Sequence, residues 1–277
     1  MKSTSRNLPL RIGLGLSLLL LALAVFGPSL AAHDPLQIYK NLRINDRTYG
    51  GPPLRAVPPF ETAQFPLGVD YISRDVLSRL LWAVRPTLIL CGVVVAARLA
   101  VGLLIGMLAG WFGRRVGWLI DVLSVLSGAV PLLLVSIGIL IALDSRNSLP
   151  IFTLALALTG WLNVATIVQS RIQTVLHAPY IESAQAIGQR PHGIFWRHVM
   201  PQVWPALPMV IAAELSATTL LIAELGYLGF YIGGGYTYTD STRDGPTPDI
   251  VKEAAGQPEL GQMLSDFFGQ YNRTPWV

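Results

Sequence analysis

The chain has 277 residues, of which 52% are hydrophobic and only 13% are charged, whereas soluble domains contain ~25% charged residues. Together with a mean hydropathy of +0.51, this composition argues against an ordinary soluble enzyme and a disordered regulator, and it predicts an integral membrane protein. The net charge of +4 arises mostly from basic residues that flank apolar runs, which indicates orientation in a bilayer and not nucleic-acid binding.

Five apolar stretches are long enough to cross a bilayer as helices, which takes about 20 residues each. They are Ile12–Ala32, Thr87–Phe112, Val122–Leu143, Pro150–Val168 and Pro205–Ala223. The first stretch follows Lys2, Arg6 and Arg11 and ends near Ser29-Leu30-Ala31, which is also the pattern of a cleavable signal peptide. Because four further spans follow, we favour a retained anchor helix over residues 1–32, and cleavage stays an open alternative.

The segment 33–85 is rich in proline and turn residues, for example at Gly50–Pro53 and Pro58-Pro59. It predicts an extended external loop without a domain of its own. The end of this segment, Asp75–Trp82, predicts a short amphipathic helix on the membrane surface, and Pro86 is then expected to start the second span.

The loops after the second and fourth spans contain more basic than acidic residues. The basic residues are Arg114, Arg115, Arg171, Arg190 and Arg197, and the acidic residue is Glu182. Because loops rich in arginine and lysine stay in the cytoplasm, the N-terminus and the loops 113–117 and 170–204 are expected there. The segment 33–85 and the tail 233–277 are expected outside.

The loop 170–204 is the most informative part of the sequence. Pro179 predicts the start of a helix and Gly188 its end, and Glu182 lies in the first turn, where the helix dipole favours an anion. The small residues between them would allow a second chain to approach closely. A loop of this length is long for a simple connection between spans. It therefore favours a docking element for a cytoplasmic partner over an ordinary connecting loop.

Four motifs resemble those of permeases of ATP-binding-cassette (ABC) importers, in the branch for peptides and nickel. The loop residues Glu182-Ser183-Ala184, Gly188 and His198-Val199-Met200-Pro201 resemble the EAA loop, with mild departures at Ser183, His198 and Met200. The other three motifs, in chain order, are Gly68–Leu80, Ala223–Gly229 and Pro258–Leu264. The first of these departs from the signature of the branch at Val69 and Ser73. The resemblance covers the chain from about the first span to its end.

The resemblance implies an all-α membrane bundle of the type I importer permease kind, with residues 86–277 as the permease core. That branch has six spans, of which five are visible here. The sixth would follow Asp266, but the sequence stops at Pro275-Trp276-Val277. The expectation is therefore a fragment or a truncated product, with 233–257 as an insertion.

The resemblance also assigns roles to the loop. The residues implied to dock into a separate ATPase and to transmit its closure are Glu182, Ser183, Ala184, Gly188, His198 and Pro201. The chain lacks the Gly-x4-Gly-Lys-Ser/Thr phosphate loop, so the partner ATPase would bind ATP and Mg. The other implied partners are a second permease subunit in a heterodimer, an external solute-binding protein and the lipid bilayer. The implied location is the bacterial inner membrane, crossed several times, with a cytoplasmic N-terminus.

Two ionisable residues interrupt apolar spans, Arg98 in the second and Glu214 in the fifth. Because a charge in the bilayer is costly, we expect the two to pair inside the bundle or to line the pathway. For Arg98, snorkelling to the membrane surface is an equal alternative.

Catalytic and metal sites are not expected. The sequence has no G-x-S-x-G and no His-Glu-x-x-His motif, and the loop histidines His177, His192 and His198 lack the spacing of metal ligands. The alternatives to a transporter subunit are a truncated or non-transporting membrane scaffold and, less favoured, a membrane-bound enzyme.

Overall fold

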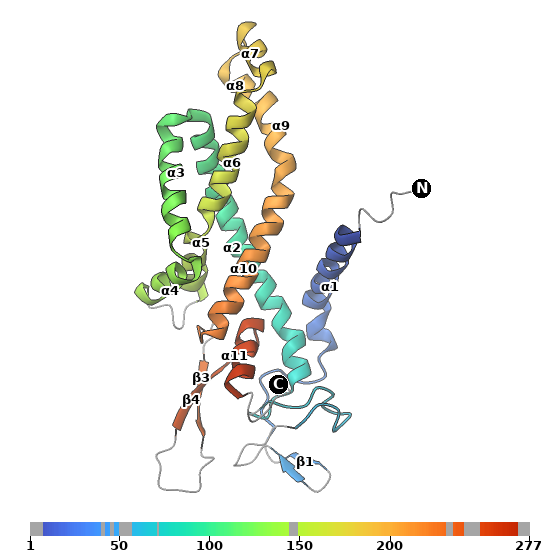
Figure 1. The fold of residues 1–277 in the computed structure, drawn as a ribbon. Coiled ribbons are helices and arrows are strands. Elements are labelled where there is room, and N and C mark those ends of the chain that lie inside the picture. The colour runs from blue at the N-terminus through green and yellow to red at the C-terminus, as the bar shows by residue number, and fades with distance from the viewer. Residues whose placement is uncertain are drawn as a thin grey trace. The chain divides into compact units, whose positions relative to one another are not determined.

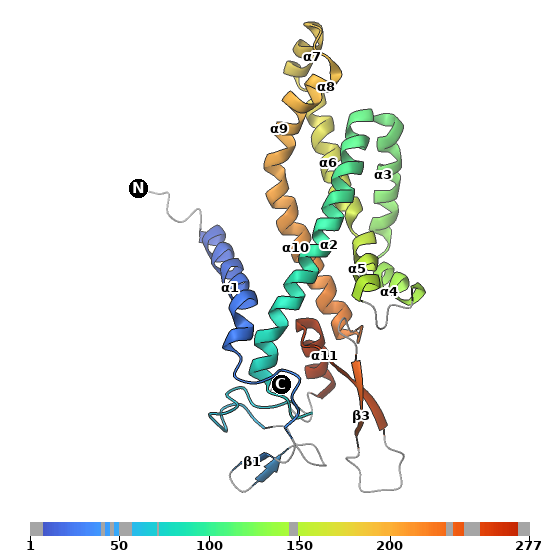
Figure 2. The same cartoon turned by 180° about the vertical axis from the view of Figure 1, so that it is seen from behind.

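The computed structural model describes residues 8–39, 42–44, 47–49, 57–70, 72–143, 149–230, 235–240 and 250–270. Figures 1 and 2 show its ribbon from two sides. The chain divides into two compact units. Unit 1 comprises residues 1–89, 146–148 and 222–277, and unit 2 comprises residues 90–145 and 149–221. Residues Gly50–Pro53 and Pro275–Val277 lie outside the described residues.

The helical membrane fold expected from the sequence is confirmed. In the described part of the chain, four helical stretches are long and apolar enough to span a membrane. They are α1 (Leu8–Leu30), α2 (Val76–Phe112), the pair α5 (Leu149–Leu158) and α6 (Trp161–Leu176), and the run Pro191–Tyr227, which ends in α10 (Leu207–Tyr227). A bent pair, α3 (Arg114–Ala129) and α4 (Leu132–Ala142), makes a fifth stretch if it counts as one span. Each stretch overlaps one of the five expected from the sequence.

Two antiparallel hairpins accompany the helices. One joins β1 (Leu42–Ile44) to β2 (Arg47–Tyr49), and the other joins β3 (Gly235–Asp240) to β4 (Ile250–Ala255). Both belong to unit 1. The second hairpin lies in the stretch 233–257, which the resemblance marked as an insertion.

The expected surface helix over Asp75–Trp82 is wrong as a separate element. Residues Val76–Phe112 form one helix of 37 residues with Pro86 in its interior. A proline removes one backbone donor, here the one that would bond to the Trp82 carbonyl, and apolar spanning helices tolerate this loss when neighbouring groups compensate. The next residue, Thr87, donates from Oγ1 to the Ala83 carbonyl at 2.9 Å.

The third expected span, Val122–Leu143, is not one straight helix. The axes of α3 and α4 differ by 93° at a break between Ala129 and Leu132. A proline disfavours the helical conformation in the residue before it, and Val130 is accordingly extended, with φ −117° and ψ 127°. Pro131 is the N-cap residue that precedes α4. The bend is therefore a local consequence of the Val130-Pro131 pair.

Three glycines on one face of α2 bring this helix close to α6. A Cβ added at Gly102, Gly106 or Gly110 would lie 2.5 Å, 2.6 Å or 2.7 Å from the nearest atom of α6. At Gly106 that atom is the backbone oxygen of Ala165, which cannot rotate away. Glycines spaced by four residues serve in this way where apolar helices pack closely.

Gly106→Ala is expected to destabilise unit 2 by about 1–3 kcal/mol, because the new methyl group would overlap the α6 backbone. The measurement is the midpoint of unfolding by sodium dodecyl sulfate. Gly138→Ala is the matched control, since a Cβ on this exposed helical glycine of α4 meets nothing within 4 Å. Equal midpoints for the two variants would contradict the close packing.

Unit 1 contains a small folded core that the sequence analysis missed in the segment 33–85. Val57, Phe65 and Val69 are fully buried together. Beside them, buried Asp70 accepts a hydrogen bond from Arg74 Nε at 2.7 Å and from the backbone N–H of Arg74 at 2.8 Å. This part of the segment is therefore more than an extended loop. The sequence signal was the Asp70 and Arg74 pair, four residues apart in the Gly68–Leu80 motif.

His33 connects the end of α1 to the same core. Its Nδ1 lies 3.0 Å from Asp75 Oδ2, and its ring stacks on Phe65 with a centroid distance of 4.9 Å. Ser78 Oγ donates to the same Asp75 oxygen at 2.5 Å. These contacts fix the start of α2.

Ser73 occupies a position where the signature of the peptide and nickel branch has glycine. Its φ is +69°, in the left-handed region that favours glycine. The buried Ser73 hydroxyl also has no hydrogen-bond partner among the described residues. Backbone strain and an unsatisfied buried hydroxyl each cost on the order of 1–3 kcal/mol.

Ser73→Gly is therefore expected to stabilise unit 1 by about 1 kcal/mol, after the entropy that glycine loses on folding is subtracted. Ser78→Gly is the contrasting control, because it removes the hydrogen bond to Asp75 and should destabilise the same unit. The measurement is the unfolding midpoint, which should rise for Ser73→Gly and fall for Ser78→Gly. A lower midpoint for Ser73→Gly would contradict the predicted strain at this position.

Candidate coupling site

The loop after α6 contains a short helix with well-defined ends. Helix α7 (Pro179–Ala186) begins with Pro179 at its first position, and Glu182 lies in its first turn. At its end, Gly188 has a φ of +77°. The Gln189 N–H donates to the Ala184 carbonyl at 3.1 Å, and the Gly188 N–H donates to the Gln185 carbonyl at 2.9 Å. This pair of bonds is a Schellman motif. The helix start and stop expected from the sequence are confirmed.

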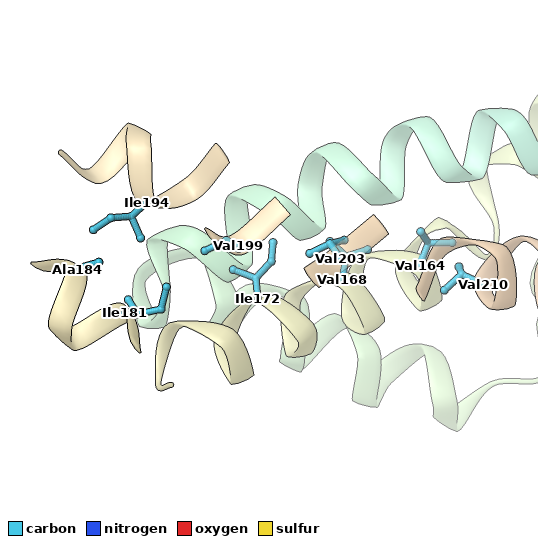
Figure 3. Close-up of a cluster of buried hydrophobic side chains, with 9 residues drawn as sticks. All are labelled: Val164, Val168, Ile172, Ile181, Ala184, Ile194, Val199, Val203 and Val210. Atoms are coloured by element: carbon cyan, nitrogen blue, oxygen red, sulfur yellow. The ribbon is translucent and has the colours of Figure 1, made fainter. Parts of the chain in front are cut away.

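A cluster of buried apolar side chains in unit 2 holds α7 in place (Figure 3). Ile181 and Ala184 are its members from α7. The remaining members come from α6 and from the run that starts at Pro191, and they are Val164, Val168, Ile172, Ile194, Val199, Val203 and Val210. Because apolar packing continues from the body of α6 to α7, a force on α7 would reach the spanning helices through close contacts.

One face of α7 is buried and the other is exposed, and Ala184 lies on the buried face. Ala184 is only 6% exposed and belongs to the internal cluster, so it does not offer its surface to another chain as the sequence analysis expected. The exposed face carries Glu182 and Ser183, and Ile187 next to the helix end is 81% exposed. Ser183 Oγ donates to the Pro179 carbonyl at 3.1 Å. No described residue provides a hydrogen bond or ion pair to the Glu182 carboxylate.

The remaining predicted loop residues lie in the helical run that follows α7. This run comprises α8 (Pro191–Ile194), the π-helical turn η2 (Phe195–Val199), α9 (Met200–Val203), the 3-10 turn η3 (Trp204–Ala206) and α10. The helical run is continuous from Pro191 to Tyr227. Prolines lack the backbone donor, and irregular turns lie beside Pro201 and Pro205.

Of the two remaining residues, His198 lies beside α7 and Pro201 is exposed. The His198 ring lies 6.4 Å from the ring of Tyr180 in α7, and its Nδ1 is buried without a hydrogen-bond partner among the described residues. Pro201 is exposed. His198 is therefore the member of this pair that lies next to α7.

A second polar site lies inside unit 2, around Arg98 of α2. Arg98 is fully buried. Its Nη1 donates to Glu214 Oε2 at 3.3 Å and to Thr218 Oγ1 at 3.0 Å. Its Nη2 donates to Thr159 Oγ1 at 2.9 Å, and its Nε donates to the Leu156 carbonyl at 3.0 Å. The guanidinium is thus held among α2, α5 and α10, an arrangement that does not fit snorkelling.

The break between α5 and α6 makes room for this guanidinium. Gly160 has a φ of +79°, and a Cβ on it would lie 2.7 Å from Arg98 Cζ. The interrupted helix leaves the Leu156 carbonyl available to Arg98. Asn163, in the first turn of α6, donates from Nδ2 to Glu214 Oε1 at 2.8 Å. Both carboxylate oxygens of Glu214 therefore accept hydrogen bonds.

The sequence analysis missed the neutral members of this network. Thr218 had a usable signal, because it follows Glu214 by one helical turn in an apolar run. The sequence carries no signal for the roles of Thr159, Gly160 and Asn163, because these roles depend on the interruption between α5 and α6. Over the described residues, no group of three or more His, Cys, Asp or Glu side chains could hold a metal ion.

Apolar helices joined by a loop that carries a short, partly exposed helix define a multi-span membrane protein. Comparison with known families gives the particular class. The chain belongs to the family described as the binding-protein-dependent transport system inner membrane component, whose profile matches residues 102–264. It is a multi-pass inner-membrane permease subunit of an ABC importer.

Curated permease proteins are similar to this chain over most of its length. The di/tripeptide transport system permease protein DppC of Pseudomonas aeruginosa is 28% identical over 269 residues, which is 96% of this chain and 77% of the relative. The oligopeptide transport system permease protein OppC of Bacillus subtilis is 25% identical, over 79% of this chain and 66% of the relative. The inner membrane ABC transporter permease protein YejE of Escherichia coli is 30% identical, over 76% of this chain and 55% of the relative. The branch inferred from the four motifs is confirmed.

Proposed function

We propose that this chain moves peptides or similar small solutes across the inner membrane by alternating access, with energy supplied by a separate ATPase. The similarity to di/tripeptide and oligopeptide permeases supports peptides as the substrate class. The chain contributes the pathway and no catalytic step of its own. ATP and Mg are bound by the partner ATPase.

The observation that carries this proposal is the construction of α7. Its exposed face presents the Glu182 carboxylate, which has no partner among the described residues, and its buried face joins the cluster that continues into α6. In the proposed arrangement the cytoplasmic ATPase binds the exposed face, and ATP-driven closure moves the spanning helices through the cluster. The N-terminus and the loop 170–204 are then cytoplasmic, and segments 33–85 and 233–277 are external.

The proposed assembly has further partners. A second, similar permease subunit completes the pathway as a heterodimer, and an external solute-binding protein delivers the solute. The bilayer surrounds the spans. The domain boundaries that follow are an anchor helix at 1–32, an external segment at 33–85 and the permease core at 86–277.

An uptake assay tests the proposal. A host without its own peptide importers receives this chain together with a second permease, ATPases and a solute-binding protein of a peptide importer. We expect ATP-dependent uptake of labelled di- and tripeptides, which stops when the ATPases cannot bind ATP. Uptake of nickel without peptide uptake would refute the substrate class. Assembly of all subunits without any uptake would favour the alternative of a non-transporting scaffold.

A further inference from the structure

Unit 2 contains an open apolar groove that the proposed function does not use. Its volume is about 530 Å³, and it lies between the last turns of α2 and the run that begins with α8. One wall is formed by Leu104, Leu108 and Phe112, and the opposite wall by Phe195 and Trp196. The groove therefore offers a lining suited to a hydrocarbon chain.

Aromatic rings concentrate in this groove. Trp111 meets Phe195 edge to face with a centroid distance of 5.1 Å, and Phe195 meets Trp196 in the same way at 5.3 Å. Tryptophan is enriched where spanning helices reach the membrane surface. The groove lies at the end of the apolar α2 helix, which stops at Phe112. It is therefore expected at the depth where lipid headgroups meet acyl chains.

Arginines adjoin the residues of the groove lining in the sequence. Arg190 stands immediately before α8, Arg197 follows Trp196, and both side chains are exposed. Arg114 and Arg115 follow Phe112 closely in the sequence. The sequence contains neither Asp nor Glu between Asp75 and Asp121, or between Glu182 and Glu214. Both segments that line the groove are therefore free of acidic residues.

We propose that this groove binds an anionic phospholipid, with an acyl chain in the apolar part and the phosphate near Arg190 and Arg197. Basic sites beside spanning helices on the cytoplasmic side are suited to anionic headgroups. The positive surroundings distinguish this occupant from a zwitterionic lipid. No residue of α7 lines the groove, but Arg190 and Arg197 belong to the same loop 170–204. Lipid binding and ATPase co-purification are therefore measured separately on each variant.

Tryptophan quenching provides a direct test, because Trp111 and Trp196 line the groove. The permease, purified with its partner permease, is placed in nanodiscs that contain phosphatidylglycerol or phosphatidylcholine with brominated acyl chains. We expect phosphatidylglycerol to quench at a lower mole fraction. The difference between the two lipids should disappear in the Trp111→Phe/Trp196→Phe variant. Equal quenching by both lipids would overturn the proposal.

Arginine variants test the contribution of charge. Arg190→Gln and Arg197→Gln are each expected to weaken the preference for phosphatidylglycerol by about fivefold, the effect of one basic residue near an anionic surface. Arg171→Gln, which alters an exposed arginine on α6, is the control and should retain the preference. High salt should weaken the preference of the unaltered protein in the same way. An unchanged preference in both variants and in salt, or a groove closed to lipid by the partner permease, would refute the site.

Discussion

Gly188→Val is expected to abolish co-purification of the ATPase and ATP-driven uptake. The native φ of +77° lies in a region that a β-branched side chain avoids, so the Schellman motif that ends α7 cannot form without strain. Strain of this kind costs on the order of 1–3 kcal/mol. Because the packing of the rest of unit 2 does not depend on this exposed residue, the loss should be confined to α7 and its partner.

Two further variants distinguish a loss of the α7 fold from a loss of its contact with the ATPase. Glu182→Lys reverses an exposed charge without altering the buried face of α7, so it should weaken ATPase binding about tenfold or more while the unfolding midpoint stays unchanged. Gly193→Ala is the matched control, since a Cβ at this helical glycine meets nothing within 4 Å. Normal ATPase binding in both Gly188→Val and Glu182→Lys would refute the assigned role of α7.

Arg98→Met is expected to cause the largest loss of stability of any single substitution considered for unit 2, about 3–5 kcal/mol. It leaves the Glu214 carboxylate buried without its positive partner, and breaking a buried ion pair in this way has that typical cost. The measurement is the midpoint of unfolding by sodium dodecyl sulfate, together with the amount of protein that reaches the membrane.

A double-mutant cycle isolates the pair itself. Arg98→Met combined with Glu214→Gln should cost at least about 1 kcal/mol less than the sum of the two single variants, because the double variant contains no unpaired buried charge. The charge swap Arg98→Glu/Glu214→Arg should restore stability only in part. Glutamate cannot donate to the Leu156 carbonyl as Arg98 Nε does. Strictly additive costs in the cycle would contradict the energetic importance of the pair.

Much of the fold could be predicted because bilayer thickness and local backbone preferences act over short ranges of sequence. Apolar length located all five candidate spans. Pro179 and Gly188 gave the bounds of α7 because proline and glycine have distinct backbone limits. The Pro131 bend had a visible signal as well, but the same residue type is tolerated inside a continuous helix at Pro86. Sequence alone did not distinguish these two outcomes.

The tertiary environment of individual residues could not be predicted. Ala184 was expected on the surface with its neighbours, and its position on the buried face of α7 depends on how α7 packs against α6 and α8. Arg98 had two equal interpretations until the break at Gly160 was seen to create its pocket and to supply an acceptor. The small core around Val57 and Phe65 was hidden by the proline-rich composition of its segment.

Labelling of a single cysteine in α7 tests the central claim most directly. The chain has one native cysteine, Cys91, which is buried, so Ser183→Cys places a reactive thiol on the exposed face of α7 with little background. We predict that a membrane-impermeant maleimide labels this variant in inside-out vesicles but not in intact cells, and that saturating ATPase blocks the labelling. Labelling from outside the cell, or labelling that bound ATPase leaves unchanged, would contradict a cytoplasmic coupling role for α7.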